Sequence, residues 1–238
     1  MTLAGKTIVV IGGSSGIGLA TAKAALLEGA NVVITGRSPE RLSAARKELG
    51  STVRTVAADA SDETAMRAVF SELPKVDHAF VTAAELVYSP TITADTATLR
   101  AAIDARFWGA FFTAKYAAPK MPPEGSITFL TGVAGRKPLP GGAVISASCS
   151  AVESLGRGLA IELAPIRVNT VAPGLIDTPL HSKMTGKSAS ERFPDIAKRL
   201  PVRRMGQPED IAAAVLFLMK NPFVTGITLT IDGGHLLV

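Results

Sequence analysis

Stretches rich in valine, isoleucine and threonine alternate with longer stretches of helical periodicity along the whole chain. This alternation is typical of repeated strand–helix–strand units, in which parallel strands form a sheet with helices on both faces. The sequence predicts strands at residues 7–11, 31–35, 53–57, 76–82, 126–131, 166–171 and 227–231. It predicts helices at residues 16–28, 39–49, 62–72, 95–118, 143–163 and 208–220. We therefore expect an α/β protein with a Rossmann-type, doubly wound, seven-stranded parallel sheet.

The organisation of the chain indicates a single domain. Its 238 residues are enough for one large α/β core, and no repeat, low-complexity tract or linker divides them. We therefore expect residues 1–238 to form one domain. The segment at residues 179–206 breaks the alternation of strands and helices with Gly186, Pro194 and Pro201. Long segments of this kind often close over a pocket, so we expect a mobile lid there.

Charge and composition exclude several classes of function. The formal net charge is +5, but lysine and arginine are dispersed, so nucleic-acid binding is not expected. No apolar run approaches the roughly 18 residues that a membrane span needs, so we expect no membrane insertion. The single cysteine, Cys149, excludes an internal disulfide, and no leader segment is evident, which favours a cytoplasmic setting. No two histidines, cysteines or acidic residues recur at the spacing of metal ligands, so no metal is expected.

A glycine-rich turn follows the first predicted strand. Its glycines lie between that strand and the next predicted helix. Glycines at such a turn let backbone N–H groups approach a pyrophosphate at the N-terminus of a helix. We therefore expect this turn to bind the phosphates of a dinucleotide. The residues concerned are Gly12, Ser14, Ser15, Gly16, Ile17 and Gly18. The alternative is a turn that is merely flexible.

The end of the second predicted strand indicates which dinucleotide is bound. No acid follows this strand, where a carboxylate would accept a hydrogen bond from the ribose 2′-hydroxyl; the chain has Gly36, Arg37 and Ser38 instead. Gly36 leaves space, and the planar guanidinium of Arg37 can bind a 2′-phosphate. We therefore expect NADP(H) to be preferred over NAD(H), with Arg37 and Ser38 at this phosphate. The alternative is that Arg37 is only solvated.

Several motifs resemble those of one known family. The glycine spacing of residues 12–18 resembles the TGxxxGxG turn of short-chain dehydrogenases, with Ile11 where threonine is usual. Further matching segments are 168–179, 206–211 and 231–234. The chain thus resembles the short-chain dehydrogenase/reductase family, especially its 3-oxoacyl-carrier-protein reductase-like members, over nearly all of residues 5–235. The resemblance implies an NADP(H)-dependent oxidoreductase acting on a small carbonyl or hydroxyl substrate. It also implies a homo-oligomer, a dimer or a tetramer, formed through the helices at 95–118 and 143–163.

The same resemblance implies where the rest of the dinucleotide lies. Asp59 and Ala60 match the pair that lies beside the adenine in the family, although an N-cap role for Asp59 is the alternative. A segment that turns under the nicotinamide would hold the carboxamide with the backbone at Ile176 and the hydroxyl of Thr178. The other residues implied to contact the cofactor are Ala83, Ala84, Pro173 and Gly174.

The residues that carry the family's chemistry are replaced. The family uses an asparagine, a serine, a tyrosine and a lysine, and the matching positions are Arg106, Gly132, Ile145 and Cys149. Reduction of a ketone needs a proton for the developing alkoxide, and a positioned general acid contributes about 10²–10⁴-fold. Ile145 has no proton to give. The catalytic residues are therefore left unassigned, and hydride transfer by the family's own mechanism is not expected.

Two other residues offer substitutes for the missing polar groups. Glu85 replaces a glycine of the family close to the cofactor, and one hypothesis pairs it with Arg106. The alternative pairs Arg106 with Asp104 or solvent and leaves Glu85 on a surface loop. Tyr88 lies in a loop that borders the substrate cleft in the family, so its phenol could act as an acid. The alternative is that Tyr88 is an aromatic wall residue.

The three histidines are not close to one another in the sequence. His78 is expected to be buried on the fourth predicted strand, and His235 is expected at a subunit contact near the C-terminus. A substrate contact by His181, in the predicted lid, is left open. A nucleophilic role for Cys149 would require a nearby base to lower its pKa, and the sequence indicates none. Ser148, beside this position, is expected to be structural.

Three hypotheses about function follow. The chain is an oxidoreductase in which Tyr88, Arg106 or solvent supplies the proton, or whose substrate needs none, such as an activated double bond or an iminium. Alternatively, it is a cyclase, an isomerase or a lyase that uses the same pocket, with Arg106 and Glu85 as its polar groups. In the third hypothesis it is a non-catalytic NADP(H)-binding regulatory or partner subunit.

Overall fold

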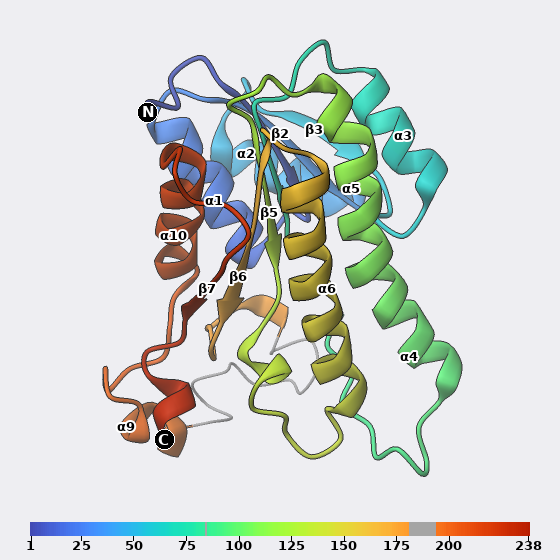
Figure 1. Cartoon of the computed structure of the whole chain (residues 1–238), viewed down its shortest axis with the longest axis vertical. Helices are drawn as coiled ribbons and strands as arrows, with labels where there is room; N and C mark the ends of the chain where they lie inside the picture. The colour runs from blue at the N-terminus through green and yellow to red at the C-terminus, as the bar shows by residue number, and fades with distance from the viewer. Residues whose placement is uncertain (84, 181–193) are drawn as a thin grey trace.

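Seven parallel strands form one sheet in the computed structural model, which describes residues 1–83, 85–180 and 194–238 (Figure 1). The order of the strands is β3-β2-β1-β4-β5-β6-β7. Their bounds are β1 Thr7–Ile11, β2 Asn31–Gly36, β3 Arg54–Ala57, β4 His78–Val81, β5 Ser126–Leu130, β6 Arg167–Pro173 and β7 Thr228–Ile231. The order reverses between β1 and β4, and ligands of such sheets bind at this reversal, outside the carboxyl ends of the strands. The predicted Rossmann-type sheet is confirmed.

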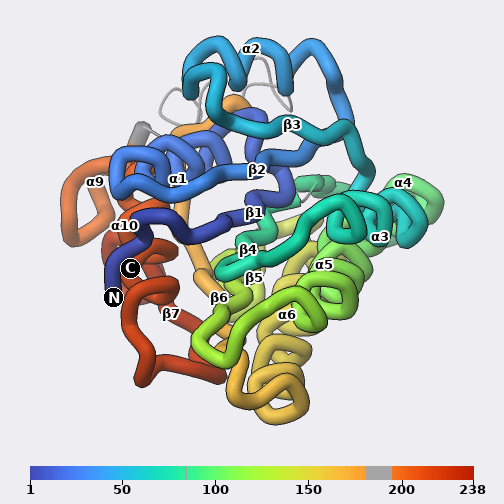
Figure 2. The backbone as a smooth tube through the Cα atoms, turned by 90° about the horizontal axis from the view of Figure 1, so that it is seen from above, coloured from blue at the N-terminus to red at the C-terminus, as the bar shows by residue number. Residues whose placement is uncertain are grey.

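Helices cover both faces of the sheet (Figure 2). One face carries α1 (Gly16–Leu27), α2 (Pro39–Leu49) and α10 (Pro208–Lys220). The other face carries α3 (Glu63–Ser71), α4 (Thr96–Ile103), α5 (Gly109–Ala117) and α6 (Ala143–Glu162). None of the helices in the described part of the chain is long and apolar enough to cross a membrane.

The alternation of side chains along the strands divides the core into two clusters. In β1, Val9 and Ile11 belong to the cluster that packs against α3, α5 and α6, whereas Ile8 and Val10 belong to the cluster that packs against α1, α2 and α10. Successive side chains of a strand point to opposite faces, so a strand that is covered on both sides is apolar throughout. The apolar runs in the sequence are therefore explained by burial from two sides.

The stretch predicted as one helix at residues 95–118 is divided in the structure into α4, a π-helical turn η1 (Asp104–Trp108) and α5. The ends of the other predicted strands and helices differ from the observed ends by no more than two residues. A π-helical turn holds an additional residue and is often found at functional sites. Arg106 lies in the middle of this turn.

The predicted lid at residues 179–206 is only partly covered by the structure. Residues 181–193 lie outside the described residues, and so does His181. The described remainder contains a short helix, α9 (Pro194–Arg199), which the sequence pattern did not predict. Mobility of this segment stays a prediction.

Candidate functional site

The glycine turn is tied to the end of β4 at the point where the strand order reverses. Gly12 has a φ of +88°, and a Cβ at this position would lie 2.5 Å from Thr82 Oγ1. The Thr82 hydroxyl donates a hydrogen bond to the carbonyl oxygen of Gly12 at 3.0 Å. A Cβ on Gly18 would overlap the same carbonyl group. Side chains are therefore excluded at both positions, and the backbone stays open to a ligand.

The first turn of α1 leaves its backbone N–H groups available. Ser15 is the N-cap of this helix, but its side chain makes no capping hydrogen bond. Helices α2, α3 and α4, in contrast, are capped by the side chains of Ser38, Asp62 and Asp95. Free N–H groups and the helix dipole together favour an anion at this end of α1. The turn therefore fits a pyrophosphate.

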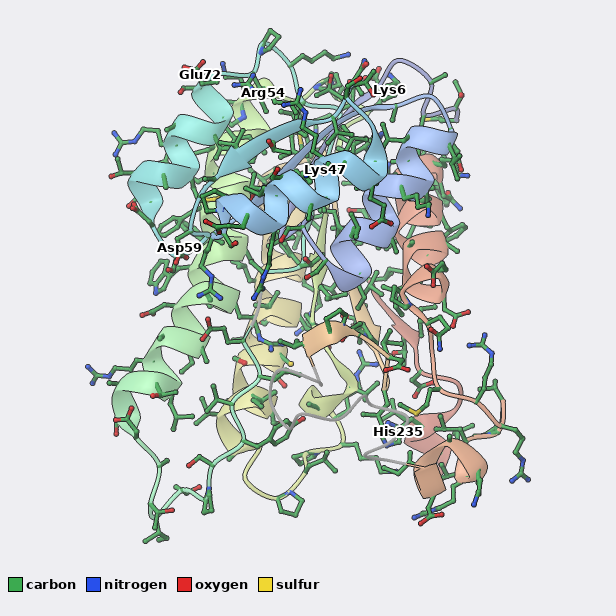
Figure 3. All side chains as sticks on the ribbon, turned by 180° about the vertical axis from the view of Figure 1, so that it is seen from behind. Lys6, Lys47, Arg54, Asp59, Glu72 and His235 are labelled. Carbon is green, nitrogen blue, oxygen red and sulfur yellow. The ribbon has the colours of Figure 1, made fainter. Side chains whose placement is uncertain are left out.

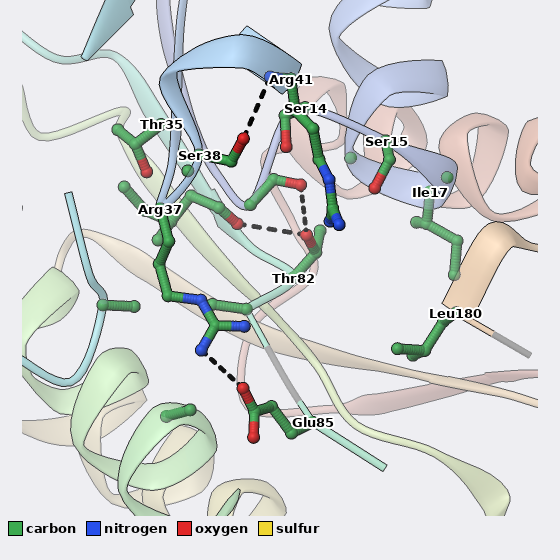
Figure 4. Close-up of a pocket in the computed structure, with 18 of the residues that line it drawn as sticks. Ser14, Ser15, Ile17, Thr35, Arg37, Ser38, Arg41, Thr82, Glu85 and Leu180 are labelled. Atoms are coloured by element: carbon green, nitrogen blue, oxygen red, sulfur yellow. Dashed lines mark hydrogen bonds and ion pairs between the residues drawn. The ribbon is translucent and has the colours of Figure 1, made fainter. Parts of the chain in front are cut away.

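A cavity of about 370 Å³ lies at this end of the sheet, and we call it the glycine-turn cavity (Figure 4). It brings together twelve of the residues predicted to bind the cofactor: Gly12, Ser14, Ser15, Gly16, Ile17, Gly18, Arg37, Ser38, Asp59, Ala60, Ala83 and Thr178. Ala84 lies outside the described residues. Most of the predicted cofactor residues thus share one cavity, although they come from distant parts of the sequence.

The charged residues of this cavity are paired differently from the prediction. Arg37 Nη1 lies 2.5 Å from Glu85 Oε1, so Glu85 pairs with Arg37 and the hypothesis that it pairs with Arg106 is wrong. Arg37 is also not simply solvated, because it makes this ion pair. A second arginine, Arg41, lines the same cavity (Figure 4). Arg41 was not among the residues predicted from the sequence, although its position in the first turn of α2 indicates that it lies close to Arg37.

The alternative role of Asp59 as an N-cap is wrong. The N-cap of α3 is Asp62, whose carboxylate accepts hydrogen bonds from the N–H groups of Thr64 and Ala65. Asp59 Oδ1 instead accepts hydrogen bonds from the backbone N–H and the hydroxyl of Ser61, at 2.9 and 2.7 Å. The carboxylate is thus held in place, and Asp59 lines the glycine-turn cavity.

A second cavity, of about 140 Å³, adjoins the first, and we call it the Arg106 cavity. The two share Ile17, Thr82, Leu130, Thr178 and Leu180 in their linings. The residues at all four replaced positions line it, namely Arg106, Gly132, Ile145 and Cys149. Pro173, Gly174 and Ile176, which the resemblance places at the nicotinamide, line it as well. The positions that carry the chemistry of the family therefore meet in this cavity.

Arg106 is buried in the wall of this cavity and is 4% exposed. Its Nη1 donates a hydrogen bond to Cys149 Sγ at 2.9 Å, and its buried Nε has no partner among the described residues. The alternative that pairs Arg106 with Asp104 or solvent is therefore wrong too. Its guanidinium contacts Cys149, at the position that matches the family's lysine. A positive charge carried by η1 therefore lies beside that position.

Cys149 is a neutral thiol in this environment. Burial raises its pKa, and the nearby charge of Arg106 opposes this effect only in part. A thiol with a raised pKa is a poor nucleophile at neutral pH. Ile145, one helical turn away, is 4% exposed and apolar. The hydroxyl of Ser148 donates to the carbonyl oxygen of Ile145 at 2.8 Å, so its predicted structural role is confirmed.

His235 lines the Arg106 cavity, whereas the sequence analysis expected it at a subunit contact. It belongs to the C-terminal turn η4 (His235–Leu237) and is 8% exposed (Figure 3). Its Nδ1 is buried without a hydrogen-bond partner among the described residues, and burial lowers its pKa. No pattern near the C-terminus indicates this position, because it depends on how the last turn packs against the loop after β5. Lys137 of that loop donates to the carbonyl oxygen of His235 at 3.0 Å.

Other candidates lie as predicted or outside this cavity. Tyr88 lines the Arg106 cavity, as both of its predicted roles require. Of the two cavities described above, Glu85 lines the glycine-turn cavity and not the Arg106 cavity, and it pairs with Arg37, so it is not the acid partner of Arg106. His78 is buried on β4, as predicted, and its Nδ1 lies 2.8 Å from Ser126 Oγ. Among the described residues, no group of three histidine, cysteine or acidic side chains could hold a metal.

Comparisons with known proteins agree with this architecture. The model of a family described as enoyl-(acyl carrier protein) reductase matches residues 11–235. The short-chain dehydrogenase/reductase malC of Malbranchea aurantiaca is 32% identical, over 99% of this chain and 96% of its own length. The solved structure of MalC, described as a reductase/Diels-Alderase, superposes with a TM-score of 0.92 at 31% identity over 99% of this chain and 98% of that one.

Two further relatives bear on the cofactor. The NADP-dependent (R)-specific alcohol dehydrogenase of Lentilactobacillus kefiri is 33% identical, over 98% of this chain and 97% of its own length. A small-chain dehydrogenase solved in complex with NADPH superposes with a TM-score of 0.83 at 32% identity, covering 98% of this chain and 100% of that one.

Proposed function

The chain belongs to the short-chain dehydrogenase/reductase family, and from this premise we propose that it is an NADP(H)-binding oxidoreductase in which Arg106 replaces the family's tyrosine and lysine. The observation that carries the proposal is the position of the Arg106 guanidinium. It is buried, contacts Cys149 Sγ and lines the cavity that adjoins the glycine turn. A permanent positive charge therefore lies where the family's chemistry takes place.

The glycine turn supports binding of the dinucleotide. Its uncapped helix N-terminus suits the pyrophosphate, and no Cβ obstructs the backbone at Gly12 and Gly18. Arg37 and Arg41 supply two cations for a 2′-phosphate at the other end of the same cavity. An NADP-dependent relative and a relative solved with NADPH support the same cofactor.

The residues of the Arg106 cavity limit the chemistry that remains. When bound, the nicotinamide ring supplies or accepts a hydride. Ile145 cannot donate a proton, and the raised pKa of Cys149 keeps its thiol neutral. A guanidinium is a permanent cation, so Arg106 stabilises negative charge on the substrate and does not transfer a proton. The phenol of Tyr88, which lines the same cavity, or solvent would then supply the proton.

Among the substrates considered, an activated double bond suits these residues better than an iminium. A guanidinium repels a cationic iminium, whereas addition of a hydride to a conjugated double bond builds negative charge on an oxygen. Arg106 can stabilise that oxygen by charge-assisted hydrogen bonds. The matching family model is described as a reductase of an enoyl group, which supports this class of substrate.

Nucleotide binding is the first experiment. We would titrate the purified protein with NADPH and NADH by calorimetry and repeat both titrations with Arg37→Ala. The expected result is micromolar NADPH binding, on the order of −8 kcal/mol, that Arg37→Ala weakens without a matching loss for NADH. Absence of binding by either nucleotide would refute the proposal.

Turnover is the second experiment. NADPH consumption would be followed with conjugated enones and with simple ketones, and again with the variant Arg106→Met, which keeps an unbranched apolar side chain, though a shorter one, and removes the charge. We expect enones to be consumed and ketones not. Loss of one preorganised charged donor should lower the rate about 10²-fold or more while NADPH still binds. An unchanged rate in Arg106→Met would contradict the role of this residue.

A non-redox reaction in the same cavity is the second candidate function. The observation that favours it is the similarity to MalC, which is described as a reductase/Diels-Alderase. Conversion of a substrate without a change in nicotinamide absorbance would identify such a reaction. Nucleotide binding without any turnover would instead favour a regulatory or partner subunit.

We also propose that the chain forms a homodimer or a homotetramer through α5 and α6. Trp108 is 42% exposed and stacks on Phe112, with ring centroids 5.7 Å apart, and Ile161 on α6 is 83% exposed. Exposed apolar side chains on neighbouring helices suit a contact between subunits. Light scattering would give the mass in solution, and Trp108→Glu is expected to lower it. A monomeric wild-type protein would refute this proposal.

A further inference from the structure

Two buried nitrogen atoms without hydrogen-bond partners belong to residues that line the same cavity. Arg106 is 4% exposed and its Nε has no partner among the described residues. His235 is 8% exposed and its Nδ1 has none either. Both side chains line the Arg106 cavity, although they come from a π-helical turn and from the C-terminal turn. Buried polar groups are almost always paired, so two such groups at one cavity point to a ligand.

The charged side chains that line this cavity carry positive charge. Arg106 and Lys137 line it as cations, and no aspartate or glutamate is found among the described residues of its lining. Lys137 Nζ already donates to the backbone carbonyl oxygens of His235 and Val238, so Arg106 is the cation that lacks an oxygen partner. Two acidic side chains elsewhere in the described chain have partners of their own: Glu85 pairs with Arg37, and Glu153 pairs with Arg136 at 3.0 Å. A cavity with cationic walls and no acid attracts anions.

Burial of an unpaired guanidinium is unfavourable in the free protein. The sulfur of Cys149 is a weak hydrogen-bond acceptor and carries no charge while the thiol is protonated, so it offsets little of the desolvation of Arg106. A bound carboxylate would supply the missing charge and accept hydrogen bonds from a planar guanidinium in its preferred geometry. The buried cation therefore favours a negatively charged ligand.

Most of the rest of the wall is apolar, with three threonines and Tyr88 as its other polar side chains. Leu86, Leu130, Leu139 and Ile145 line the cavity together with Val133. The Arg106 cavity has a volume of about 140 Å³. It adjoins the glycine-turn cavity, which the dinucleotide would occupy. A ligand that fits this combination has a small apolar body and one anionic group.

We propose that the Arg106 cavity binds a substrate with a free carboxylate on a small apolar body, and that Arg106 and His235 donate hydrogen bonds to this carboxylate. His235 Nδ1 is enclosed in this structure, so the ring has to turn toward the ligand and donates in the tautomer that carries its proton on Nδ1. The inference rests on the proposed function only in taking this cavity as the substrate site. It narrows the substrate from activated double bonds in general to those, such as enones, in molecules that also carry a separate carboxylate.

A matched pair of ligands tests the charge requirement. Cinnamate and cinnamamide have the same apolar body and nearly the same shape, but only cinnamate is an anion at neutral pH. Binding of each would be measured by calorimetry to the full chain, with and without saturating NADP⁺. We expect cinnamate to bind about tenfold or more tightly than cinnamamide. Equal binding of the two compounds would overturn the proposal.

Three variants locate the effect. Arg106→Met is expected to remove the preference for cinnamate, and His235→Gln to reduce cinnamate affinity about threefold without changing that of cinnamamide. Arg67→Met, which removes an exposed arginine of α3, is the control for net charge and should leave both affinities unchanged. An Arg106→Met variant that keeps the preference, or an equal loss in Arg67→Met, would overturn the proposal.

Three outcomes can be distinguished: misfolding of a variant, failure of the proposed function and failure of this inference. Removal of an unpaired buried charge should not lower thermal stability, so Arg106→Met is expected to melt at or above the temperature of the wild type. If Arg106→Met unfolds instead, His235→Gln tests the proposal: a loss of cinnamate affinity without a change for cinnamamide supports it, and unchanged affinities for both overturn it. NADPH binding without a preference for cinnamate refutes the inference alone, whereas a preference for cinnamate without NADPH binding refutes the proposed function alone.

Discussion

The ion pair between Arg37 and Glu85 is expected to weaken the binding of NADPH. Both side chains line the glycine-turn cavity, where Arg37 Nη1 lies 2.5 Å from Glu85 Oε1. A 2′-phosphate bound by Arg37 would have to displace this carboxylate or lie beside it, and both carry negative charge. Replacing Glu85 by glutamine keeps the size of the side chain and removes its charge. Glu85→Gln should therefore bind NADPH more tightly than the wild type.

The size of this effect follows from exposure. The Arg37 side chain is 61% exposed and that of Glu85 is 34% exposed, so their pair contributes only about 0.2–1 kcal/mol. Repulsion between Glu85 and a 2′-phosphate adds about 1 kcal/mol for charges a few ångströms apart in water. Together these give about 1–2 kcal/mol, which corresponds to a factor of about 5–30 in the dissociation constant.

Calorimetric titration with both nucleotides measures this effect. NADH lacks the 2′-phosphate, so Glu85→Gln is not expected to tighten its binding. Glu72→Gln is the control for net charge, because Glu72 lies 3.9 Å from Arg54 in an exposed pair away from the cavity (Figure 3). The gain for NADPH should shrink as salt is added, since exposed charges are screened. An equal gain for NADH, or weaker binding of NADPH, would refute this explanation.

Three further predictions concern buried groups. The thiol of Cys149, whose pKa burial raises, should react with a disulfide reagent far more slowly in the folded protein than in urea; rapid reaction at pH 7 would contradict its burial. Cys149→Lys would place a second buried cation against Arg106 and should destabilise the fold by about 3 kcal/mol or more, and adding Arg106→Asn should recover most of this loss in urea unfolding. If the double variant is no more stable than Cys149→Lys, the contact between these two residues is not as described. Burial lowers the pKa of His78 from 6.5 to about 4. Between pH 4 and pH 6.5 the unfolded chain therefore binds a proton at this residue that the folded protein does not. Stability should therefore fall as pH decreases from 7 to 5, by about 2 kcal/mol more in the wild type than in His78→Asn; equal pH dependence in the two would refute this assignment.

The fold could be predicted from the sequence because its signals are local. Each buried strand is an apolar run, and glycine or proline ends many of the helices, as Gly50 does for α2. The cofactor residues could be predicted because the glycine turn fixes its own geometry through backbone contacts, such as that between Gly12 and Thr82. These features depend little on which side chains meet across the fold.

The pairing of charged side chains could not be predicted in the same way. Arg106 turned to Cys149, and Glu85 to Arg37, although a direct pair between Arg106 and Glu85 would satisfy the same charges. The outcome depends on the π-helical turn that orients Arg106, and no residue type in that segment marks such a turn. His235 was misplaced for a related reason, because its position depends on how the last turn of the chain packs.

The π-helical turn also ties the length of its helix to the cavity. It accommodates an additional residue within Asp104–Trp108, so in evolutionary terms it behaves as an insertion that the fold has kept. Deleting one residue there would restore regular α-helical geometry, but each residue turns a helix by about 100°, so α4 would rotate relative to α5. Either the guanidinium of Arg106 or the contacts of α4 with α6 would then be lost. A deletion that makes this helix more regular is therefore expected either to remove the cation from the cavity or to detach α4 from α6.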